Sequence, residues 1–111
     1  MSMHSVVKAG EVVGVNVKNT ANEDLGEIAE MVVDKSSGKV NYLVLDFGGF
    51  MSFGNKFFAV PWHLFTYDNN DDCFILTVDK NRLKDAPGFD KDHWPDFAST
   101  EFRSSITNFY Q

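Results

Sequence analysis

The stretch DFGGFMSFGNKFFAVPW, residues 46–62, decides how this chain folds. It holds three glycines, five phenylalanines and one lysine, and it joins two segments that are typical of strands. Such a stretch can hold a phosphate, hold a partner, or turn an apolar chain. Glycine permits positive φ angles and close backbone approach at a barrel corner, which favours the third interpretation.

Strands are predicted on both sides of this stretch. Val40–Phe47 is the clearest one, because its residues are β-branched or aromatic and glycines lie near both ends. Residues 57–60 form a second, short strand that ends at Pro61, since proline cannot donate to a strand ladder. The letters PWHLF, residues 61–65, then predict a single helical turn.

Further strands are predicted upstream and downstream. Residues 12–17 are rich in valine, and residues 25–34 have apolar spacing that suits either a helix or a long strand. Gly26 and the turn that follows favour the strand. Residues 67–72 predict a hairpin turn into a strand at 74–78. Five or six short strands at this spacing predict a mainly β protein, either a small barrel or a sandwich.

The pattern changes after residue 79 to one that is typical of helices. Asp79 predicts a capped helical turn, and Asp92 and Pro95 predict the start of a second, amphipathic helix. We therefore expect a loose or partly ordered leader at 1–11, a barrel at 12–79, and a helical extension at 80–111. We expect this extension to pack on the barrel or on a dimer mate.

Composition and charge limit the function. A chain of 111 residues with 43% hydrophobic residues predicts one folded domain. A net charge of −6 without a basic cluster does not attract nucleic acid or anionic lipid. The single cysteine excludes an internal disulfide and fits a reducing compartment. Without a signal-like start or an apolar run of about 20 residues, we expect a cytoplasmic protein that does not insert into a membrane.

The sequence contains no complete motif of a phosphate-binding, calcium-binding or other metal-binding site. A phosphate loop needs Gly-Lys-Ser/Thr, but Asn55 separates Gly54 from Lys56, and Phe57 stands where the hydroxyl belongs. The turn that starts at Asp68 resembles the opening of a calcium loop, yet Cys73 replaces its required glycine. The histidines at 4, 63 and 93 lack metal-ligand spacing. We therefore predict no catalytic residue, no metal, no cofactor and no enzymatic activity.

A family resemblance emerges from the central segment. Residues 34–65, DKSSGKVNYLVLDFGGFMSFGNKFFAVPWHLF, resemble the centre of a PRC-barrel domain. The matching elements are Gly38 with Val40, the run 47–50, Gly54 with Lys56, and Ala-Val-Pro-Trp at 59–62. The segments LGEIAEMVVD at 25–34 and LKDAPGFDKDHWPDFA at 83–98 are also similar to the family, so the resemblance covers about residues 12–110.

The resemblance implies a small, SH3-like barrel of about six strands. Members of this family include the cytoplasmic part of the photosynthetic reaction centre H subunit and the C-terminal domain of a ribosome maturation factor. Other members stand alone in bacteria and archaea, and this chain is most similar to those. Such domains generally bind other proteins or themselves and share no active site, so the resemblance assigns no catalytic residue here.

The predicted function is that of a non-catalytic protein-interaction or scaffold module that forms a homodimer. Eleven phenylalanines and an apolar helix are hard to bury in one small barrel, which favours self-association. The alternatives are an accessory factor in RNA processing or ribosome assembly, and a small-ligand binder at the barrel mouth. The predicted interaction surface consists of Phe50, Met51, Phe53, Trp62, Trp94, Phe97, Phe102, Ile106 and Phe109.

Overall fold

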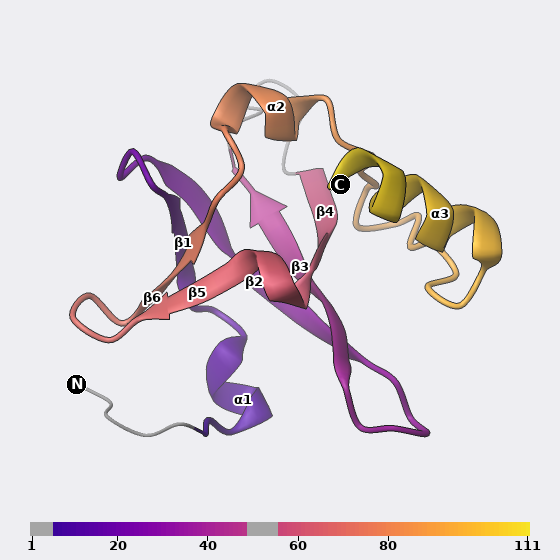
Figure 1. Ribbon diagram of the computed structural model, residues 1–111, viewed down its shortest axis with the longest axis horizontal. Helices are drawn as coiled ribbons and strands as arrows, with labels where there is room; N and C mark the ends of the chain where they lie inside the picture. The colour runs from indigo at the N-terminus through magenta and orange to yellow at the C-terminus, as the bar shows by residue number, and fades with distance from the viewer. Residues whose placement is uncertain (1–5, 49–55) are drawn as a thin grey trace.

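A computed structural model describes residues 6–48 and 56–111 (Figure 1). The mainly β character predicted from the sequence is confirmed, because strands dominate the chain and the helices are short apart from the C-terminal one. The elements in chain order are α1 Ala9–Val12, β1 Asn16–Asn19, β2 Asp24–Val33, β3 Val40–Phe47, β4 Lys56–Pro61, the 3-10 turn η1 Trp62–Leu64, β5 Phe65–Asp68, β6 Cys73–Leu76, α2 Lys80–Lys84 and α3 Thr100–Phe109.

The six strands form one sheet that curls into a half-barrel (Figure 1). Its order is β4-β3-β2-β1-β6-β5, so β4 and β5 are the edge strands and η1 joins them. All neighbouring strands are antiparallel except β1 and β6, which are parallel. The connection through η1 therefore carries the chain from one edge of the sheet directly to the other.

The concave side of the sheet encloses the main core. Leu43 and Leu45 of β3 are fully buried there, and the ring of Phe47 packs against that of Phe58 at a centroid distance of 5.8 Å. Both faces of the centre of β3 are buried, which explains its continuous run of apolar residues. The strand that was clearest in the sequence is therefore the one with the most buried surroundings.

A second, smaller core lies under α3. Tyr42, Ala59 and Ile106 are buried together, so α3 covers the outer side of β3 and β4 in the same chain. The rings of Tyr42 and Phe102 meet edge to face at a centroid distance of 6.0 Å. Figure 1 shows α3 in yellow beside β4.

The first strand begins later than the sequence predicts. The prediction of a strand at 12–17 is wrong, because α1 ends at Val12 and β1 begins at Asn16. Gly14 has a φ of 91°, a left-handed conformation that turns the chain between them. The Gly14 amide donates to the Ile28 carbonyl at 2.7 Å, so β2 stabilises the turn.

The last helix also begins later than predicted. Asp92 and Pro95 do not start it. Residues 90–99 are irregular, and α3 begins at Thr100. The Asp96 carboxylate accepts from the Ala98 amide at 3.0 Å, a local turn that competes with helix. The apolar residues at 94–97 make ring contacts and do not form a helix face, since Trp94 and Phe97 both pack on Phe89.

Ser99 is the N-cap of α3, and its loss is expected to be measurable. Its hydroxyl accepts from the Phe102 amide at 3.1 Å. Ser99→Ala should lower the free energy of unfolding in urea by about 1 kcal/mol, because an amide of the first turn loses its partner. Ser104→Ala, at an exposed position within the same helix, is the control and should cause no loss. Equal effects of the two substitutions would contradict the assignment of the cap.

Candidate interaction surfaces

Two exposed aromatic side chains mark the sheet edge formed by β5. Trp62 is 39% exposed and Tyr67 is 38% exposed, although both rings contact the buried Phe74. The ring centroids are 6.2 Å apart for Trp62 and Phe74, and 5.2 Å apart for Tyr67 and Phe74. Phe65 packs on the same ring at 5.7 Å. These contacts restrict the exposed rings, so binding a partner would cost them little further conformational entropy.

The strand between these rings has an open side. Within the described part of the chain, β5 pairs with β6 alone. Edge strands in natural proteins are usually protected by lysine, proline or a covering segment. β5 is short, with the sequence FTYD, and its one charged residue is Asp68 at its end. It has neither lysine nor proline, and Thr66 at its centre is exposed. We call this surface, made of Trp62, Thr66 and Tyr67, the β5 edge.

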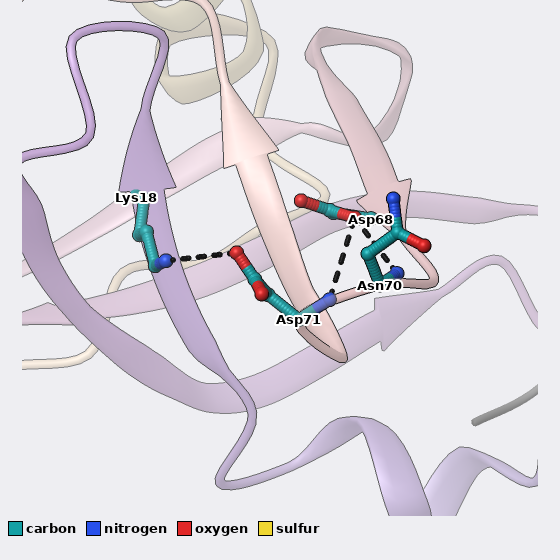
Figure 2. Close-up of polar contacts among 4 residues, drawn as sticks. All are labelled: Lys18, Asp68, Asn70 and Asp71. Atoms are coloured by element: carbon teal, nitrogen blue, oxygen red, sulfur yellow. Dashed lines mark hydrogen bonds and ion pairs between the residues drawn. The ribbon is translucent and has the colours of Figure 1, made fainter.

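The turn from β5 to β6 is acidic, and its carboxylates are engaged in local contacts (Figure 2). The Asp68 carboxylate accepts from the Asn70 amide at 2.9 Å and from the Asp71 amide at 3.4 Å. Lys18 of β1 reaches across to pair with Asp71, with Nζ and Oδ2 3.3 Å apart. Within residues 6–48 and 56–111, no three His, Cys, Asp or Glu side chains are grouped so that they could hold a metal ion.

Cys73 follows this turn and is buried. Burial raises the pKa of its thiol, so the protonated form dominates at neutral pH. A buried thiol in this state is a poor nucleophile. We therefore assign Cys73 to packing at the start of β6.

The structure separates the predicted interaction residues into different environments. Phe97, Phe102 and Ile106 face the sheet of their own chain, with Ile106 fully buried. Phe109 is half-buried beneath the guanidinium of Arg82, which also donates to its carbonyl. Phe50, Met51 and Phe53 lie outside the described residues.

Two tryptophans of the predicted surface remain exposed, in different places. Trp94 is 42% exposed and contacts Phe57 and Phe89, at centroid distances of 5.5 and 5.0 Å. Trp62 lies at the β5 edge together with Tyr67. Sequence reasoning missed Tyr67, because it assigned residue 67 to the hairpin turn. Its position two residues after Phe65, and therefore on the same strand face, was the available signal.

A groove of about 390 Å³ opens between α3 and the adjoining ends of β3 and β4. Tyr42, Pro61 and Trp62 supply apolar lining from the sheet and η1, while Arg103 and Tyr110 come from α3 and its end. The Tyr110 hydroxyl is buried and has no hydrogen-bond partner among the described residues. Burial raises the pKa of this phenol, so it stays protonated at neutral pH.

Comparison with known proteins agrees with the fold. The model of the PRC-barrel domain family matches residues 4–83, a range that contains all six strands and ends before α3. No individual curated protein matches the chain in sequence. None of the helices in the described ranges is both long and apolar enough to span a bilayer. The match covers well over half of the 111 residues and confirms the resemblance found in the sequence, so the chain belongs to the PRC-barrel domain family.

Proposed function

We propose that this chain is a non-catalytic protein-interaction module that self-associates through the β5 edge. The observation that carries the proposal is the exposure of Trp62 and Tyr67 beside an edge strand that has neither lysine nor proline. Exposed aromatic residues on a restricted scaffold are typical of interface centres. A strand edge adds backbone donors and acceptors that a second strand can use.

The order of residues along the edge favours a second copy as the partner. In a two-fold antiparallel pair, the start of one strand lies opposite the end of the other. With Thr66 at the centre of the pair, Phe65 of one copy would lie opposite Tyr67 of the other, and Leu64, just before β5, would lie opposite Asp68. This arrangement places the aromatic rings of Phe65 and Tyr67 opposite one another across the strand pair and buries both copies of Tyr67.

The surroundings of the reactive side chains support a non-catalytic role. In the β5–β6 turn, the Asp68 carboxylate caps backbone amides, that of Asp71 pairs with Lys18, and that of Asp72 accepts from the Tyr67 hydroxyl, while the Cys73 thiol is buried. General acid–base or nucleophilic catalysis would need such groups directed toward a substrate site.

Light scattering after gel filtration tests self-association. The wild type is expected to elute with twice the chain mass of 12.5 kDa, and Thr66→Lys with the mass of one chain. The added lysine places two like charges at the centre of the two-fold pair, and it is a device that protects natural edges. Thr20→Lys changes charge equally at an exposed turn residue outside β5 and should leave the dimer intact.

Two outcomes would overturn the proposal. One is a wild type that remains a single chain up to millimolar concentration. The other is a Thr66→Lys variant that is folded and still dimeric, because the contact would then lie elsewhere. Circular dichroism of each variant shows whether the fold is retained.

A further inference from the structure

The groove under α3 has the size and lining of a small-molecule site. Its volume of about 390 Å³ lies within the range of natural ligand pockets. Trp62 offers aromatic surface, because its indole is partly open to solvent, and the largely buried Tyr42 also lines the groove. A flat apolar ring is the ligand feature that such a surface accommodates best.

The charge of the lining points to an anion. Arg103 is the one formally charged side chain among the described lining residues, in a protein whose net charge is −6. The ion pairs of the described ranges are Lys18–Asp71 and Asp90–His93, so no carboxylate lies within 4.0 Å of the Arg103 guanidinium. A free guanidinium fork matches a carboxylate in shape and charge.

The neighbouring carboxylate of Asp34 does not occupy this guanidinium. The pKa of the Asp34 carboxyl is lowered mainly by hydrogen bonds from the amides of Ser37 and Ser36, at 2.9 and 2.8 Å. The charge of Arg103 makes only a smaller contribution.

We propose that this groove binds a small aromatic carboxylate, with its carboxylate on Arg103 and its ring against Trp62. The groove shares Trp62 with the β5 edge, whereas Arg103 lies on α3, so the Thr66→Lys variant, in which the edge is blocked, separates this site from the proposed self-association.

Titration with benzoate, followed by NMR of the full chain, tests the proposal. The chain has two tryptophans, and Trp94 is absent from the groove lining, so its indole N–H signal is an internal control. The Trp62 indole signal is expected to shift saturably, with a dissociation constant on the order of 1 mM for so small a probe. The Trp94 signal should not move.

Matched ligands and variants identify the parts of the site. Benzamide keeps the ring without the charge and should bind about tenfold more weakly than benzoate. Acetate keeps the charge without the ring and should show the same loss. Arg103→Gln should weaken benzoate about tenfold, whereas Lys84→Gln, which removes the same charge from exposed α2, should not.

Three results would overturn this assignment. They are a Trp62 signal that does not saturate up to tens of millimolar benzoate, equal affinity for benzoate and benzamide, or unchanged affinity in a folded Arg103→Gln variant. The benzamide comparison uses the wild type, so it decides the matter even if a variant fails to fold. A dimer dissociated by Thr66→Lys that still binds benzoate would separate this site from the β5 edge.

Discussion

Gly26→Ala is expected to lower the free energy of unfolding by at least about 4 kcal/mol, which would leave most of so small a domain unfolded. Gly26 has a φ of 126°, and a Cβ atom there would lie 2.0 Å from the carbonyl oxygen of Asp46. The opposing atom belongs to the backbone of β3, so it cannot rotate away as a side chain would. Urea denaturation followed by circular dichroism measures the loss.

Gly38→Ala is the matched control for this prediction. Gly38 also has a positive φ, 77°, but a Cβ atom there would meet nothing within 4 Å. Its substitution should cost only the backbone strain, about 1–2 kcal/mol. Similar losses for the two variants would show that β2 and β3 do not approach as closely as the structure has them.

Gly26 also illustrates why the strands were predictable from the sequence. Residues 25–34 carried apolar spacing that suited a helix, yet Gly26 and the turn that follows the segment favoured a strand, and β2 is a strand. β3 matches its predicted position because burial on both faces is visible as a continuous run of apolar residues. The turn η1 matches because Pro61 directly precedes it. The cap of α2 was predictable for the same reason, since Asp79 accepts from the Asn81 amide.

Other features depend on contacts between distant segments, and the sequence did not predict them. α3 was expected to begin near Asp92, but the rings of Trp94 and Phe97 pack on Phe89, and the helix begins at Thr100. The groove joins η1 to α3, and no local pattern indicates that these two elements are neighbours. Exposure of Tyr67 likewise follows from the place of β5 at the edge of the sheet.

Ile106→Ala is expected to lower the free energy of unfolding by about 3 kcal/mol. Ile106 is fully buried between α3 and the outer side of β3 and β4, where it packs with Tyr42 and Ala59. Truncation removes apolar contacts and leaves a cavity that the aromatic neighbours cannot fill, since their rings pack on one another. Asn108→Ala, an exposed change in the same helix, should cause no loss and serves as the control.

The same substitution distinguishes packing on the chain's own sheet from packing on a second copy. If α3 covers its own sheet, the loss from Ile106→Ala is the same in the Thr66→Lys background as in the wild type and does not depend on protein concentration. If α3 packed on a partner, association would stabilise the folded form. The free energy of unfolding of every variant that retains Ile106 would then rise with protein concentration, even after the β5 edge is blocked. Urea unfolding of the Thr66→Lys protein at two concentrations a hundredfold apart therefore tests the position of α3 independently of the β5 edge.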